Sequence, residues 1–327
     1  MKLLAPVSSL DSAIKQINAG AGEIYLGGDT DAFNNLSFSG RGKFNPNMEK
    51  LCPGYEEIKE IVTFAHSKDV TVMYAANLPF LADDVDSSGV YTKHFLDYIE
   101  TGLKAGVDSL IIADIGAILL LREKGIETHI TASTFLETIN LDQILFLKEI
   151  GVNRAVLSYQ VVMPEIEKLS KLSPIEIEVF GHFGCSFYDG YCNLKHFFGE
   201  KNDSGIGIPC QNVYSLEKNG EKIASGQILN SSLVCGICSI PKLKELGVYA
   251  LKLVGRARNV DQNVEITSIY SQVLKRIEKK EENRTNDQEF LQLIRDEILP
   301  RWWTQGLCRN NLCKYKMNHV TKAFVGL

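Results

Sequence analysis

The chain has 327 residues, a formal net charge of −5 and an apolar content of 45%, which are values typical of a globular protein. The negative charge weighs against a nucleic-acid footprint over the whole surface, but it leaves room for a local basic patch. There is no run of about 18 apolar residues, and the N-terminal apolar run is too short for a signal peptide. We therefore expect a cytoplasmic protein without a membrane span.

Apolar runs of strand length recur along the first 254 residues, and most are followed by a helical pattern. The expected strands are 2–6, 23–26, 70–75, 109–113, 129–132, 154–157, 176–180 and 250–254. The expected helices are 9–19, 55–67, 93–105, 115–124, 141–149, 163–172 and 241–246. Gly106, Gly151 and Gly247 stand where helix C-caps would precede strands. This α/β pattern predicts a TIM-like (β/α)8 barrel, with a doubly wound open sheet as the alternative.

We expect the barrel to occupy residues 1–260, with a cysteine-rich insertion over 182–241 between the seventh and eighth strands. Residues 261–327 are expected to form a short helical C-terminal extension, with helices at 261–282 and 288–298. The extension is too short to fold alone, so it should pack on the barrel. Trp302 and Trp303 are expected to anchor it there.

Cysteines gather in the insertion, which contains Cys185, Cys192, Cys210, Cys235 and Cys238 out of eight in the chain. In a reducing compartment, clustered thiols indicate metal binding rather than disulfides. Only one CxxC pair is present, so the spacing favours a [4Fe–4S] cluster over a zinc site, with ordinary buried thiols as a third option. Cys308 and Cys313 form a CxxxxC pair that serves the same site, a second site or none. Cys52 follows no pattern and is expected to be a core thiol.

In a barrel, reactive groups lie at the carboxyl ends of the strands. These ends carry polar residues but no acid–base pair or nucleophile triad, which indicates that a cofactor supplies the chemistry. His182 is the candidate catalytic residue, with a structural histidine as the alternative. Arg41 and Arg256 are candidates to bind an anionic ligand, because guanidinium groups hold carboxylates bidentately. Asn77 and Ser133 are further candidates for contact with substrate.

Three stretches resemble the U32 "peptidase" family over roughly residues 2–260: LLAPVSSLDSAIKQINAGAGEIYLGG, TASTFLETINLDQILFLKEIGVNRAVLS, and FGHFGCSFYDGYC with PCQN and CGICSIPKLKELGVYALKLVGR. The resemblance implies a (β/α)8 barrel. Several members of this family are oxygen-independent hydroxylases with a [4Fe–4S] cluster, including ubiquinone-biosynthesis, tRNA and 23S rRNA hydroxylation proteins. Members use prephenate as the hydroxyl donor.

The resemblance also implies a ligand set for the cluster: Cys185, Cys192, Cys210 and Cys235, with Cys238 as the alternative fourth ligand. Cys235 is preferred because it stands six residues before Pro241, as the family's fourth cysteine stands before a proline. The sequence departs from the family around the pocket, where Val254 replaces the acid of a Glu-Gly-Arg motif and Tyr159-Gln160 replaces Arg-Glu. These departures leave the substrate and the donor open.

The expected function is an iron–sulfur-dependent, oxygen-independent hydroxylase of a small or carrier-bound substrate, with an anionic donor such as prephenate. A U32-type peptidase is one alternative, although the sequence has no HExxH motif and no evident nucleophile–base pairing. A non-catalytic, cluster-binding subunit of a heteromeric hydroxylase is the other. Homo-oligomers and hetero-oligomers both stay open.

Overall fold

The computed structural model describes residues 1–29, 52–77, 89–182, 213–226, 234–255, 259–283, 287–310 and 312–315. Several residues singled out in the sequence lie outside these ranges: Arg41, Cys185, Cys192, Cys210 and Arg256. Most of the cysteine-rich insertion lies outside them as well.

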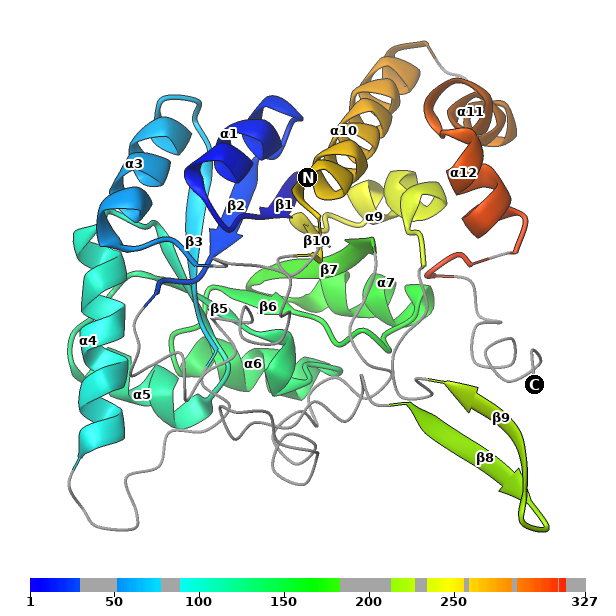
Figure 1. Cartoon of the computed structure of the whole chain (residues 1–327). Helices are drawn as coiled ribbons and strands as arrows, with labels where there is room; N and C mark the ends of the chain where they lie inside the picture. The colour runs from blue at the N-terminus through cyan, green and yellow to red at the C-terminus, as the bar shows by residue number, and fades with distance from the viewer. Residues whose placement is uncertain are drawn as a thin grey trace.

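Eight parallel strands close into a barrel in the order β1-β10-β7-β6-β5-β4-β3-β2 (Figure 1). They are β1 (Lys2–Pro6), β2 (Glu23–Leu26), β3 (Thr71–Ala76), β4 (Ser109–Ile112), β5 (His129–Ala132), β6 (Arg154–Val156), β7 (Glu176–His182) and β10 (Ala250–Leu253). The predicted barrel is therefore confirmed. The open-sheet alternative is wrong, because β1 pairs with both β2 and β10 and leaves no edge.

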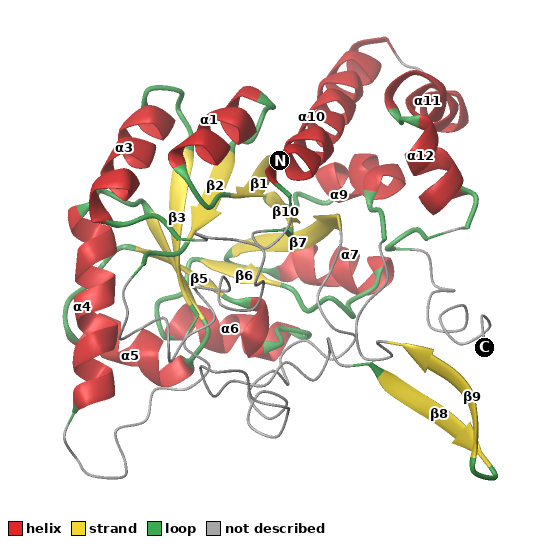
Figure 2. Cartoon of the chain, viewed as in Figure 1, coloured by secondary structure: helices red, strands yellow, loops and turns green. Residues whose placement is uncertain are grey.

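The helices that alternate with these strands surround the barrel (Figure 2). They are α1 (Leu10–Asn18), α3 (Tyr55–His66), α4 (Val90–Lys104), α5 (Ile115–Glu123), α6 (Leu141–Glu149), α7 (Met163–Leu172) and α9 (Ile240–Glu245). Gly106, Gly151 and Gly247 follow helices with φ of 91°, 88° and 76°, so they occupy the left-handed conformation of helix C-caps, as predicted.

The C-terminal helices pack beside β1, β7 and β10 (Figure 1). They are α10 (Val260–Asn283), α11 (Asp287–Leu293), the π-helical turn η5 (Ile294–Ile298), α12 (Arg301–Trp303) and the π-helical turn η6 (Thr304–Cys308). Trp303 is fully buried, whereas Trp302 is 50% exposed. Trp303 is therefore the anchor of this segment. No helix in the described part of the chain is long and apolar enough to cross a membrane.

A two-stranded hairpin, β8 (Tyr214–Lys218) and β9 (Glu221–Gly226), projects away from the barrel (Figure 1). The expected elements do not include it, because its polar residues hide the alternation of a strand. Its loop is Asn219-Gly220, with φ of 55° and 81°. Asn-Gly favours this two-residue turn, so that dipeptide was the available signal.

Charged side chains fill the amino-terminal half of the barrel. Arg154 at the start of β6 donates to both carboxylate oxygens of Glu23 at the start of β2, at 2.7 and 3.0 Å. Because β6 and β2 lie on opposite sides of the barrel, this bidentate pair spans its interior. Glu178 accepts hydrogen bonds from Arg154 and Lys252, both at 3.2 Å. Each buried carboxylate therefore has a cationic partner, as burial in an apolar interior requires.

Replacing Arg154 with Met should destabilise the protein by about 3–5 kcal/mol, because Glu23 and Glu178 would lose their shared partner while remaining buried. Urea unfolding measures this loss. The control is Lys171→Met, which removes an exposed ion pair with Glu167. It should cost less than about 1 kcal/mol. Equal losses in the two variants would contradict a supporting role for Arg154.

Candidate functional site

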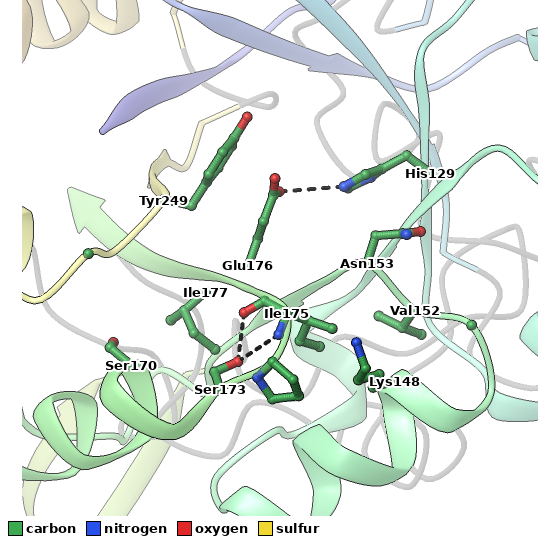
Figure 3. A pocket seen from close by; sticks show the side chains of 13 residues that line it. His129, Lys148, Val152, Asn153, Ser170, Ser173, Ile175, Glu176, Ile177 and Tyr249 are labelled. Atoms are coloured by element: carbon green, nitrogen blue, oxygen red, sulfur yellow. Dashed lines mark hydrogen bonds and ion pairs between the residues drawn. The ribbon is translucent and has the colours of Figure 1, made fainter.

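A groove of about 700 Å³ lies at the amino-terminal end of the barrel (Figure 3). Figure 3 shows Glu176 pointing toward His129, and their Oε2 and Nε2 atoms are 3.4 Å apart. Burial raises the pKa of Glu176, but the hydrogen bonds from His129 and Arg154 outweigh it, so the pKa is lowered overall. This carboxylate belongs to the ion network of the barrel. Barrel enzymes have their active sites at the carboxyl ends of the strands, so we place the candidate site at that end of the barrel.

At the carboxyl end of the barrel, a short segment around Cys235 docks on the end of β7. Cys235 forms an antiparallel bridge with His182. The Gly236 amide donates to the Gly181 carbonyl at 2.8 Å and lies 3.2 Å from the Tyr270 hydroxyl. A Cβ atom on Gly236 would stand only 2.7 Å from that carbonyl oxygen. Glycine is therefore needed for this close approach.

His182 faces the C-terminal helices. A register shift at the end of β7 pairs Lys252 with Phe180 but Leu253 with His182, so one residue of β7 is passed over. The His182 ring lies 4.5 Å from the Trp303 ring and 5.7 Å from the Tyr270 ring, and the residue is 1% exposed. The catalytic role of His182 stays a prediction. This enclosure also suits the structural role that the sequence left open.

Four cysteines line one small pocket between the barrel rim and the C-terminal helices: Cys235, Cys238, Cys308 and Cys313. The Cys235 amide donates to the Leu312 carbonyl at 2.9 Å, and the Lys314 amide donates to the Cys235 carbonyl at 2.8 Å. This parallel bridge sets Cys313 beside Cys235. The CxxC pair and the CxxxxC pair, which lie far apart in the sequence, therefore meet. Cys52 is buried away from them, as expected.

The protonation of Cys235 bears on what this pocket can bind. Burial raises the pKa of the Cys235 thiol to about 12, although the Ile237 amide and the Trp303 side chain oppose the increase. At neutral pH this thiol keeps its proton unless a metal displaces it. A lining of thiols and leucines fits a thiophilic metal or an iron–sulfur cluster and does not fit Mg²⁺ or Ca²⁺.

The arrangement of ligands is not complete in the described part of the chain. Among those residues, no three His, Cys, Asp or Glu side chains are already arranged to hold a single ion. The implied cluster ligands Cys185, Cys192 and Cys210 lie outside the described residues. Of the implied set, the structure thus describes the fourth ligand Cys235 and its alternative Cys238.

Polar residues expected at the strand ends lie where the barrel opens. Asn77 follows β3 and is half-buried. Ser133 follows β5 and is 2% exposed, and its hydroxyl accepts from the Phe135 amide at 3.4 Å, capping the short turn η2 (Thr134–Leu136). Thr131 in β5 is fully buried, and its hydroxyl has no hydrogen-bond partner within the described structure. Ser133 is therefore engaged in local structure, whereas Thr131 has unused bonding capacity.

Lys314 joins this end of the barrel although the sequence did not point to it. Its Nζ donates to the Tyr159 carbonyl at 2.8 Å and lies 3.4 Å from the centre of the Tyr159 ring. The residue is 9% exposed. Its position depends on the pairing of Cys313 with Cys235, which no local pattern in the tail reveals.

Comparison with known proteins gives a consistent family match. A model described as Peptidase family U32 matches residues 8–315. The tRNA hydroxylation protein P1 of Bacillus subtilis is 27% identical, over 89% of this chain and 67% of that protein. The tRNA hydroxylation protein P of Escherichia coli is 23% identical, over 67% and 59%. A collagenase of Porphyromonas gingivalis is 22% identical, over 84% and 65%. The chain thus spans 59% to 67% of the length of these relatives.

Gly236→Ala should loosen the docking of the Cys235 segment, because the added methyl group would meet the Gly181 carbonyl oxygen. We expect a loss of about 1–3 kcal/mol in urea unfolding, as for other overpacked positions. Cys235 should also become reactive toward iodoacetamide in metal-free protein at pH 8. The control is Gly306→Ala, where an added Cβ meets nothing within 4 Å. If both variants behave like wild type, the close approach is not required.

Proposed function

The chain belongs to peptidase family U32, and from this we propose that it is an iron–sulfur-dependent, oxygen-independent hydroxylase. One observation carries the proposal: Cys235 is joined to the last residue of β7, at the end of the barrel where barrel enzymes gather their reacting groups. The relatives named tRNA hydroxylation proteins support hydroxylation as the reaction. The thiol lining around Cys235 supports a thiophilic cofactor.

We assign the [4Fe–4S] cluster to four cysteines: Cys185, Cys192, Cys210 and Cys235, with Cys238 as the alternative fourth ligand. When bound, such a cluster would supply one-electron transfer. The chain contributes the rest. The bridge to His182 fixes the Cys235 backbone, and the buried ring of Trp303 packs behind His182 and keeps water away. A dry, fixed thiolate ligand favours a stable centre.

The proposed substrates rest on the family resemblance and on arginines that follow β2 and β10 in the sequence. We propose an anionic hydroxyl donor such as prephenate, bound by Arg256 with Arg41 as a weaker candidate, and contacts from Asn77 and Ser133. Lys314 adds a buried cation at the same rim. The acceptor is a small or carrier-bound molecule. A tRNA nucleoside is the second acceptor to test, because two relatives are named for tRNA hydroxylation.

A peptidase is the competing reading, and one relative is named a collagenase. Among the described strand ends, however, the Ser133 hydroxyl caps a turn, and the His182 ring is enclosed by Tyr270 and Trp303. Neither arrangement activates a nucleophile. The third reading, a non-catalytic subunit, would keep the cluster without turning over substrate.

Anaerobically purified protein should contain about four irons and four sulfides per chain from this cluster. Serine at Cys185, Cys192 or Cys210 should abolish it, and serine at Cys235 should reduce it more than serine at Cys238. Iron and sulfide analysis with absorption spectra measures this. Cys52→Ser is the control, because Cys52 is a buried core thiol. Zinc without iron, or casein cleavage lost on mutating a residue at the barrel mouth, would favour the alternatives.

Arg256→Ala should weaken prephenate binding about ten- to hundredfold, because losing a charged hydrogen bond costs about 1.5–3 kcal/mol. Calorimetric titration of prephenate into wild type and variant, each with its cluster intact, measures the change. Lys171→Met, which alters an exposed ion pair on α7, should bind as wild type does. Equal affinities for wild type and Arg256→Ala would remove Arg256 from the site.

A further inference from the structure

We propose that Cys238, Cys308 and Cys313 ligate a second metal centre beside Cys235, distinct from the cluster assigned above. The proposal rests on the proposed function in that the cluster takes Cys235, and not the alternative Cys238, as its fourth ligand. All three thiols line the same small pocket. A site of three thiolates takes a thiophilic centre, either a single ion such as Zn²⁺ or an iron–sulfur cluster, and leaves one coordination position for an external ligand.

Both cysteine pairs are built on tight turns that present their side chains to the pocket. In the tail, the Leu312 amide donates to the Leu307 carbonyl at 2.9 Å, and Cys308 and Cys313 each directly follow one of these two residues. On the rim, the Ser239 amide donates to the Gly236 carbonyl at 2.9 Å, which closes the turn that holds Cys238. Cysteines flanking short turns are the usual way in which proteins pair thiolate ligands.

The charge balance of the pocket also suits a metal. A divalent ion with three thiolates carries one net negative charge. Arg295 lines the pocket and can offset that charge with its permanently ionised guanidinium group. The remaining walls are Leu299, Leu307 and Leu312, which exclude water and thereby strengthen metal–thiolate attraction. Three thiolates without a cation would instead repel one another.

A metal here would also fasten the tail turn to the barrel rim, beside the anchor that buried Trp303 already provides. Since no three ligands are arranged around one ion within the described residues, binding would draw the tail turn toward Cys238. Around one zinc ion the sulfur atoms would approach to about 3.8 Å, given Zn–S bonds of about 2.3 Å.

The test separates this centre from the cluster by using the full chain with Cys185→Ser, which removes the cluster under the proposed function. Cobalt(II), a spectroscopic substitute for zinc, is titrated anaerobically into this reduced protein. We expect about one equivalent to bind with thiolate-to-cobalt charge-transfer absorption, displaced by zinc. Adding Cys308→Ser and Cys313→Ser should abolish the absorption, whereas adding Cys52→Ser should leave it unchanged. Circular dichroism checks folding, and Cys238→Ser, a rim variant, provides a second loss-of-ligand test.

A parallel arm reconstitutes the wild type with ferrous iron and sulfide. If the second centre is a cluster, Cys308→Ser with Cys313→Ser should lower the iron content by about half, while cobalt binding in the other arm stays weak. Three outcomes would overturn the proposal: no difference between the tail variants and the Cys52 control in either arm, loss from the tail variants of the same iron that Cys185→Ser removes, or a Cys308–Cys313 disulfide in protein whose reduced form binds neither probe. The iron that Cys185→Ser alone removes tests the Cys185 cluster separately, so failure of one proposal is distinguished from failure of the other.

Discussion

The buried ion pair between Arg154 and Glu23 determines how the interior of the barrel is filled. It joins β6 and β2 across the barrel, and Glu178 and Lys252 extend it to β7 and β10. Burial lowers the pKa of Arg154, but hydrogen bonding to Glu23 and the charge of Glu178 outweigh this effect, so the guanidinium stays ionised. The amino-terminal half of the barrel is therefore filled by a compensated charge network. We therefore expect ligands to bind at the carboxyl end of the barrel.

At that end, backbone hydrogen bonds connect three parts of the chain that are distant in the sequence. The end of β7 pairs with the segment at Cys235, and that segment pairs in turn with the tail at Cys313. The Tyr270 hydroxyl, from α10, donates to the Gly181 carbonyl and holds the same corner. Because Cys235 stands in the middle of this series, ligation of Cys235 under the proposed function would act on both β7 and the tail. Metal binding would then be coupled to folding.

Much of the fold could be predicted from local patterns. The strands follow from apolar runs, and Gly106, Gly151 and Gly247 mark the helix ends because glycine takes a left-handed conformation at no steric cost. The Asn219-Gly220 dipeptide is a signal for the hairpin turn, but the polar residues of the two flanking strands hide the strand pattern. The site was less accessible. The direction of the His182 ring depends on a register shift between two strands, and a single sequence carries no sign of such a shift.

The tail residues show the same limit of prediction from a single sequence. They also connect the thiol pocket to the barrel mouth. Cys308 and Cys313 form a weak motif alone, and only tertiary pairing brings them to Cys235 and Cys238. Directly after Cys313, Lys314 reaches the Tyr159 carbonyl and the Tyr315 hydroxyl donates to the Phe180 carbonyl. Both partners belong to the rim at the ends of β6 and β7. A change in the ligation of Cys313 would therefore shift Lys314 and Tyr315 at the barrel mouth. The thiol pocket is in this way connected to the place where substrate is expected.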